Sequence, residues 1–317
     1  MKKIALAIAF ILSLNVSTIW AEGSSTNSGV RTIKAPRFAR PLVEKWISEY
    51  AKVEPGIQFI IAKGSQTKDN IDLNVVFDNH EANTKDFSHK IVFFGETAVL
   101  PITARSSEAA RLLEGKHLNV KKLKQLFFLN DDFEEEARKE TVSTRLHKQF
   151  EQIIIYSGSN ASSVAAPFAQ NLGEEASNFR GKRISGDDLF LNTALSKDPL
   201  GVSFNALPNI FDLQSRHVKD DLSIVGLDLK KGLADSFSDQ GSLDTVLQLL
   251  ENGKPAEVAI EKVGVAYNVA DDAVANFLEW VLENGTKYNH EFGLLNLDRK
   301  ETLVQIQQVR TPLTAQK

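Results

Sequence analysis

Residues 153–163 read Ile153-Ile154-Ile155-Tyr156-Ser157-Gly158-Ser159-Asn160-Ala161-Ser162-Ser163, and apolar residues at helical spacing follow them. Three consecutive β-branched residues, a small hydroxyl-rich turn and an apolar helical pattern predict a strand, a turn and a helix. Backbone N–H groups, serine hydroxyls and the positive end of a helix dipole meet at such a junction, which suits it to hold an anion. The alternative is an ordinary capped helix start, because serine-rich caps are common.

The position of Pro167 bears on where this helix begins. Pro167 lies four residues past Ser163. Proline has no backbone N–H, so it either removes an early hydrogen bond of the helix or moves the helix start downstream, away from the turn.

The N-terminal residues have the pattern of a secretory signal peptide. Lys2 and Lys3 precede an apolar run from Ile4 to Leu14, and Ala21 is the expected cleavage point. The run is shorter than the roughly eighteen apolar residues of a spanning helix. The chain has no cysteine, which excludes disulfides, thiolate metal sites and a lipid-anchored cysteine. We therefore expect a soluble periplasmic protein that does not span the membrane.

The charge pattern gives no sign of a nucleic-acid partner. The formal net charge is −4, and lysine and arginine are spread along the whole chain. A nucleic-acid-binding domain usually gathers its basic residues on one face.

Strand and helix patterns alternate along the chain. Residues 30–34 and 57–62 read as strands around a helix whose apolar face includes Leu42, Trp46 and Tyr50, which predicts a right-handed parallel crossover and an α/β fold. Residues 90–103 read as one long β segment with a break at Gly95, and residues 221–226 as a plausible second strand crossing between lobes. Further strands are expected at 72–77, 200–204 and 263–267, helices at 118–128, 130–148, 189–195, 242–251 and 271–283, and a polar loop at 179–185.

Three segments together resemble one known family. They are residues 35–46 (APRFARPLVEKW), residues 277–297, which contain FLEWVLENGTKY and FGLLNL, and the turn at 157–162. This pattern is similar to the phosphate-binding proteins of phosphate import ABC transporters, which have the type 2 periplasmic-binding-protein fold. The resemblance implies two α/β lobes joined by two crossing strands. We expect a signal peptide at 1–21, lobe one at 22–99 and 222–317, and lobe two at 100–221.

The resemblance also implies which residues bind the ligand. They come from a first turn, a second loop and the turn after residue 156: Arg37, Phe38, Ser65, Ser157, Gly158, Ser159, Asn160, Ala161 and Ser162. The sequence departs from the family pattern at several of these places. Arg37 stands where the family has serine or threonine, Ile155 where it has an arginine, and Ser157 where it has an aspartate. The guanidinium of Arg37 has the geometry to bind an oxyanion in place of the missing arginine.

No pattern of a catalytic or metal site is present in the sequence. The six histidines are scattered without a pair at metal-ligand spacing, and there is no Gly-x-Ser-x-Gly, His-Glu-x-x-His or phosphate-cradling Gly-rich motif. We therefore expect a protein that is not an enzyme and that has no cofactor and no bound metal.

Two functions remain open. The first is a periplasmic solute-binding protein that captures a small oxyanion, phosphate above all, in an interlobe cleft and delivers it to ABC permease subunits. The alternative is a periplasmic interaction or scaffold module of the same fold whose anion site is degenerate. The missing arginine and the shortened second loop favour the alternative.

Overall fold

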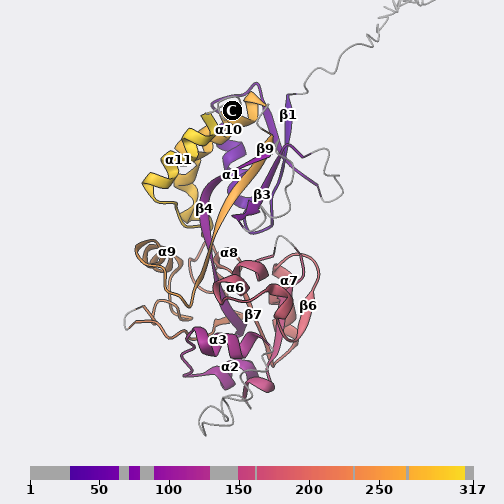
Figure 1. The fold of residues 1–317 in the computed structure, drawn as a ribbon, viewed down its shortest axis with the longest axis vertical. Helices are drawn as coiled ribbons and strands as arrows, with labels where there is room; N and C mark the ends of the chain where they lie inside the picture. Colours follow the sequence, from indigo (N-terminus) through magenta and orange to yellow (C-terminus); the bar gives the residue numbers. More distant parts are fainter. Residues whose placement is uncertain are drawn as a thin grey trace, which may run out of the picture.

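The fold consists of two α/β lobes that share one sheet (Figure 1). The computed structural model describes residues 29–63, 71–78, 89–128, 149–160, 163–230, 233–268 and 271–310. In these ranges the sheet has nine strands in the order β2-β1-β3-β9-β4-β7-β5-β6, and β8 pairs with β4. The predicted signal peptide and the helix expected at 130–148 lie outside the described residues.

Lobe one begins with the crossover that the sequence predicts. Its first elements are β1 (Val30–Lys34), α1 (Arg40–Tyr50), β2 (Gln58–Ile61) and β3 (Leu73–Phe77). β1 pairs in parallel with both β2 and β3, which confirms the parallel arrangement. The apolar face of α1 is buried through Leu42, Trp46 and Tyr50, as its spacing indicates.

The long strand β4 (His89–Ala104) passes from lobe one into lobe two. Its first part pairs antiparallel with β9 (Ala259–Asn268), and its last part pairs antiparallel with β7 (Gly201–Ala206). Val99 is partnered by Ala259 on β9 and by Ala206 on β7, so it marks the crossing point. The ladder shifts register between Phe93 and Gly95, where the sequence predicts a break.

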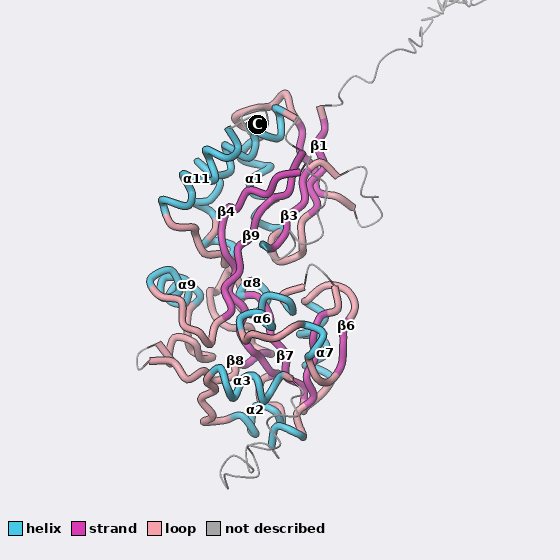
Figure 2. The backbone as a smooth tube through the Cα atoms, in the orientation of Figure 1, coloured by secondary structure: helices cyan, strands magenta, loops and turns pink. Residues whose placement is uncertain are grey.

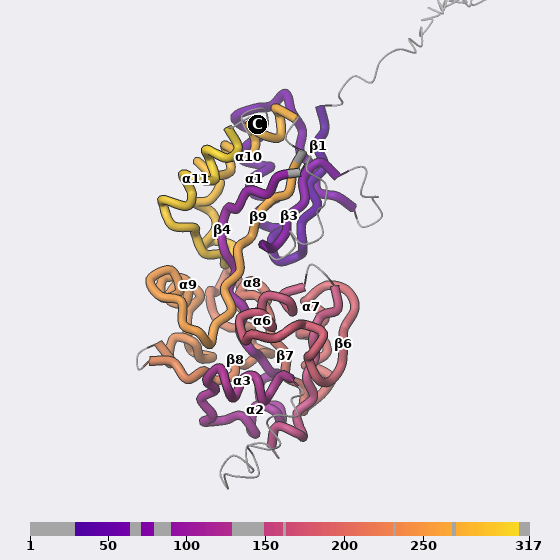
Figure 3. Tube along the Cα trace, viewed as in Figure 1, coloured from indigo at the N-terminus to yellow at the C-terminus, as the bar shows by residue number. Residues whose placement is uncertain are grey.

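The second crossing strand differs from the one expected. β8 (Leu222–Ile224) pairs with Ile102–Ala104, at the end of β4 that lies in lobe two. The strand that runs beside β4 into lobe one is β9. The pairing therefore indicates that the chain returns to lobe one at β9, later than the expected return at residue 222. Figure 3 shows the N-terminal and C-terminal parts of the chain together in one lobe and the middle of the chain in the other.

Lobe two contains the strand that the β-branched run at 153–155 predicts, and the strand extends to Gly158, into the segment predicted as a turn. β5 (Ile154–Gly158) pairs in parallel with β7 and with β6 (Lys182–Ile184). The helices of this lobe are α2 (Glu108–Leu113), α3 (Val120–Phe127), α6 (Ala165–Asn171), α7 (Leu189–Lys197) and α8 (Leu207–Ile210), with a 3-10 turn at Ala176–Asn178.

Residues 179–185 are not the polar loop that the sequence suggests. They contain β6 and a buried phenylalanine, Phe179. Its ring stacks on Phe128 at 4.6 Å and on Phe204 at 5.0 Å between ring centroids. One aromatic side chain, which packs against residues distant in sequence, thus orders a segment of polar composition.

Helices of the C-terminal region cover one side of lobe one (Figure 2). They are α10 (Asp272–Trp280), a π-helical turn at Val281–Gly285, 3-10 turns at Thr286–Tyr288 and His290–Phe292 (η6), and α11 (Arg299–Arg310). α9 (Leu243–Asn252) lies beside the crossing strands. Asp271 caps α10 by accepting from the backbone N–H groups of Ala273 and Val274, as its position before the helix predicts.

Each lobe has its own aromatic core. In lobe one the indole of Trp46 packs edge-on against Phe94 at 4.7 Å and donates to the carbonyl of Gly285 at 2.9 Å. In lobe two the ring of Phe168 stacks on Phe204 at 4.3 Å. No helix among the described residues is long and apolar enough to cross a bilayer.

Candidate functional site

The helix after the serine-rich turn begins later than the turn itself. β5 ends at Gly158, but α6 begins at Ala165 with Val164 as its N-cap residue. Pro167 is the third residue of α6, so its missing N–H falls among those that have no partner inside a helix. Two effects of Pro167 are expected, the loss of an early helical hydrogen bond or a helix start further downstream. The structure shows the downstream start. The positive end of this helix therefore lies past Ser159 and Asn160.

A carboxylate from another part of lobe two occupies the start of α6. Asp188, which precedes α7, accepts the hydroxyl of Ser163 at 2.5 Å and the backbone N–H of Val164 at 2.9 Å. The Ser163 hydroxyl oxygen in turn accepts the N–H of Ala165 at 3.2 Å. Acidic groups at a helix N-terminus are stabilising, because they satisfy free N–H groups and match the dipole. Asp188 thus provides the negative charge that this end of the helix favours.

Burial affects the ionisation of Asp188. Asp188 is only 9% exposed, and the loss of solvent around the carboxylate raises its pKa. The hydrogen bonds from Ser163 and Val164 act in the opposite direction and lower the pKa, since they stabilise the charged form. Burial is the larger of these effects, so the pKa of Asp188 is raised overall.

Buried asparagines hold Asp188 in place. The Asn205 amide donates to the backbone carbonyl of Asp188 and to the side-chain oxygen of Asn192, both at 2.9 Å. Asn209 donates to the side-chain oxygen of Asn205 at 2.8 Å, and Asn192 donates to the carbonyl of Asn209 at 2.9 Å. A buried network in which donors meet acceptors is rigid, so the backbone of Asp188 is held beside the start of α6.

The close approach of Asp188 and Ser163 requires glycine at position 158. A Cβ built on Gly158 would lie 2.1 Å from the Ser163 hydroxyl oxygen and 2.9 Å from an Asp188 carboxylate oxygen. The turn therefore packs directly onto the pair that caps α6. This glycine has a packing role in the structure.

Polar side chains of the predicted anion turn bond within lobe two. The hydroxyl and the backbone N–H of Ser159 both donate to the carbonyl of Ile184, at 3.2 and 3.0 Å. The amide of Asn160 donates to the carbonyl of Gly186 at 2.6 Å. Ser157 is fully buried, and its hydroxyl has no hydrogen-bond partner in the described part of the chain. Ser159 and Asn160 thus donate to the backbone of residues 184–186 in lobe two, and Ser157 is enclosed in the interior.

Of the two residues predicted to bind the ligand from the first turn of lobe one, one is buried and one is exposed. Phe38 is 5% exposed and its ring stacks on Phe77 at 5.5 Å, so it belongs to the core of lobe one. Arg37 is exposed. No hydrogen bond or ion pair between described residues joins residues 35–38 to residues 157–160. Three other predicted site residues, Ser65, Ala161 and Ser162, lie outside the described residues.

Asp188 is not among the residues that the sequence predicts for the site. The sequence places it just before α7, where an aspartate reads as the cap of that helix, yet its carboxylate caps α6. The only available signal was the serine-rich turn itself, because a helix start needs an acceptor from somewhere in the fold.

Comparison with solved structures identifies the fold. A phosphate ABC transporter substrate-binding protein from Clostridium perfringens, solved with bound phosphate, aligns with a TM-score of 0.58 at 12% sequence identity, over 85% of this chain and 100% of that one. An ABC-type phosphate transport receptor from Vibrio cholerae aligns with a TM-score of 0.53 at 8% identity, over 84% of this chain and 100% of that one. No family model and no curated protein matches the sequence.

These likenesses define the class of fold. The chain has the type 2 periplasmic-binding-protein fold, with two α/β lobes joined by β4 and β9, as the sequence resemblance implies. At identities of 8% and 12%, these likenesses show the fold alone. The ligand has to be inferred from the site residues of this chain.

Proposed function

We propose that this protein is a non-enzymatic binding module of the type 2 periplasmic-binding-protein fold in which the lobe-two anion site is closed by the chain's own carboxylate. The supporting observation is the position of Asp188, whose carboxylate accepts from Ser163 and Val164 at the start of α6. Of the two functions that the sequence leaves open, this is the interaction or scaffold module.

Electrostatics support this proposal over phosphate capture. Two like charges 4 Å apart repel by about 4 kcal/mol at an effective dielectric constant near 20. Micromolar binding needs about 8 kcal/mol of favourable free energy. An ionised Asp188 next to the bound anion would thus remove about half of the required free energy.

The hydrogen-bond donors of the turn support the same proposal. A charge-assisted hydrogen bond contributes about 1.5–3 kcal/mol, so a phosphate site needs several free donors. The Ser163 hydroxyl and the Val164 N–H already bond to Asp188, and the Ser159 hydroxyl and N–H bond to Ile184. Ile155, which stands where the family has an arginine, offers no charge.

The second candidate function is an oxyanion receptor, with phosphate as the first ligand to test and ABC permease subunits as partners. The exposed Arg37 favours it, because this guanidinium follows β1 in the turn that binds the anion in the family that the sequence resembles. The names of the two solved neighbours, a phosphate-binding protein and a phosphate transport receptor, also favour it. For either function we propose export to the periplasm, from the pattern of residues 1–21.

Calorimetric titration distinguishes the two functions. The mature protein is unfolded and refolded to remove carried-over anions and then titrated with phosphate, sulfate and arsenate. The interaction module predicts no saturable heat with any of the three. Saturable binding that is lost in Arg37→Ala or Ser159→Ala would contradict the module and establish the receptor.

A further inference from the structure

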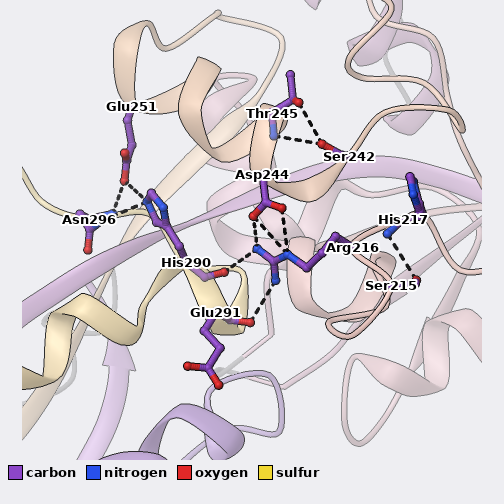
Figure 4. Close-up of polar contacts among 10 residues, drawn as sticks. All are labelled: Ser215, Arg216, His217, Ser242, Asp244, Thr245, Glu251, His290, Glu291 and Asn296. Carbon is purple, nitrogen blue, oxygen red and sulfur yellow. Dashed lines mark hydrogen bonds and ion pairs between the residues drawn. The ribbon is translucent and has the colours of Figure 1, made fainter.

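Arg216 connects the two lobes on the side of the crossing strands where α9 lies (Figure 4). Arg216 belongs to the loop between α8 and β8 in lobe two. Its guanidinium donates to the backbone carbonyl of His290 at 2.7 Å and to that of Glu291 at 3.0 Å. Both carbonyls belong to η6, which follows α10 in lobe one. One side chain thus bonds directly across from lobe two to lobe one.

The same guanidinium also binds Asp244 in the first turn of α9. Its Nη2 lies 2.6 Å and its Nε 3.1 Å from one carboxylate oxygen of Asp244. With the two carbonyl bonds, all three nitrogens of Arg216 have acceptors. The Asp244 side chain is 65% exposed, so the ion pair alone is weak. Arg216 is 20% exposed, and its bond to the carbonyl of His290 is partly buried.

The loop that carries Arg216 is held in shape before the side chain reaches its partners. The Asp212 carboxylate accepts the backbone N–H groups of Gln214 and Ser215 at 3.0 and 2.7 Å. The N–H of Arg216 donates to the carbonyl of Asp212, and Arg216 has a φ of 64°, which non-glycine residues seldom adopt. The carbonyl of Arg216 accepts the N–H of Leu243 at 2.8 Å. These bonds set the direction in which the guanidinium leaves the loop.

Contacts beside Arg216 join the same parts of the chain. The Glu251 carboxylate, near the C-terminal end of α9, lies 2.7 Å from the ring nitrogen Nε2 of His290 and accepts the N–H of Asn296 at 2.7 Å. At Gly293, with a φ of 75°, an added Cβ would lie 3.3 Å from Pro208 and 3.4 Å from Leu213. Residues 290–296 of lobe one therefore lie against α9 at Glu251 and at Leu243, and they also contact lobe two at Arg216.

We propose that Arg216, Asp244 and the carbonyls of His290 and Glu291 form a hinge latch that fixes the angle between the lobes. A hinge at Val99 changes the distance between any parts of the two lobes that lie away from it. Arg216 bonds to both sides of this hinge, so opening on the α9 side must break its two carbonyl bonds. The protein would then present its lobes in one arrangement, as a rigid module. The latch does not depend on what the turn at 157–163 binds.

Distances between spin labels on the two lobes test the latch. The sequence has no cysteine, so Val53→Cys in lobe one and Lys197→Cys in lobe two, both exposed positions, give the only two labels. Pulsed electron paramagnetic resonance then measures their distance distribution in phosphate-free buffer. The labelled parent should give a single narrow peak. Arg216→Ala should broaden this peak or add a second one, with the ratio of latched to unlatched molecules lowered roughly tenfold, a usual size for coupling between sites.

Two further variants make the result decisive. Arg310→Ala is the matched control, because Arg310 also binds two carboxylates, Glu279 and Glu283, but wholly within lobe one. It should leave the parent distribution unchanged. Arg216→Lys keeps the charge and loses the planar fork, and it should give an intermediate distribution even if Arg216→Ala does not fold. The latch would be overturned if the folded Arg216 variants gave the same distance distribution as the labelled parent. If Arg216→Ala does not fold, Arg216→Lys alone decides. Neither outcome affects the result of the anion titration.

Discussion

Asp188 and Val164 are 24 residues apart in sequence, and the carboxylate of the first accepts the backbone N–H of the second at 2.9 Å. This bond ties the start of α6 to the segment that leads into α7. Ser163 donates to the same carboxylate at 2.5 Å. The polar groups at the N-terminal end of α6 therefore have hydrogen-bond partners within the chain itself. The proposed closure of the anion site depends on this relationship.

The substitution Asp188→Asn should change how stability depends on pH. Burial raises the pKa of Asp188, so the folded state keeps the proton at a pH where the unfolded state, with a pKa of about 3.9, has lost it. The resulting stabilisation is fully present below about pH 4 and is lost as the pH rises through the raised folded pKa. An asparagine side chain does not titrate, so the variant should lack this part of the decline. Thermal unfolding of both proteins at a series of pH values measures it, and identical slopes would contradict the assignment.

Replacement of Gly158 by Ala should destabilise the protein. The added Cβ would lie 2.1 Å from the Ser163 hydroxyl oxygen, so the cap on α6 must shift. We expect a loss of about 1–3 kcal/mol in the free energy of unfolding, measured by urea denaturation. Gly253→Ala is the matched control, since a Cβ there meets no atom within 4 Å. Equal stability of the two variants would mean that the turn does not pack onto the cap.

Local patterns in the sequence were sufficient for much of lobe one. The helix at 40–50 follows from the spacing of Leu42, Trp46 and Tyr50, and all three are buried. The long strand with a break at Gly95 also follows, since β-branched residues and one glycine mark it locally. Val53, which has the same spacing, is 65% exposed because α1 ends at Tyr50.

Long-range partners were beyond the reach of these patterns. Residues 221–226 and 263–267 both read as strands, but periodicity does not say which of them pairs with β4 in lobe one. The resemblance places Phe38 at the ligand, whereas packing against Phe77 places it in the core. Asp188 reads as a cap for the helix that follows it, and only the tertiary fold brings its carboxylate to α6. In each case the deciding contact lies many residues away.

Arg180 should be important for the stability of lobe two. Its guanidinium donates to three backbone carbonyls, those of Leu126 at 2.6 Å, Phe150 at 2.6 Å and Ile153 at 3.1 Å. Burial of the group lowers its pKa to about 10. Arg180→Ala would leave these carbonyls without their donor, and we expect a loss of about 2–4 kcal/mol in urea unfolding.

Arg183→Ala provides the comparison for Arg180. Arg183 donates to the carbonyls of Ala176 and Ser177 at 2.9 and 2.8 Å, but these bonds are exposed to water. Its replacement should change the free energy of unfolding by less than about 0.5 kcal/mol. If both variants lost the same stability, burial would not be the reason for the importance of Arg180.

A crystal structure of the protein grown in phosphate tests the closure of the anion site most directly. We expect the Asp188 carboxylate to stay within hydrogen-bond distance of the Val164 N–H and the Ser163 hydroxyl, with no phosphate at the start of α6. A phosphate oxygen on the Val164 N–H, with Asp188 turned away and Arg37 bound to the same anion, would contradict the account and establish an oxyanion receptor.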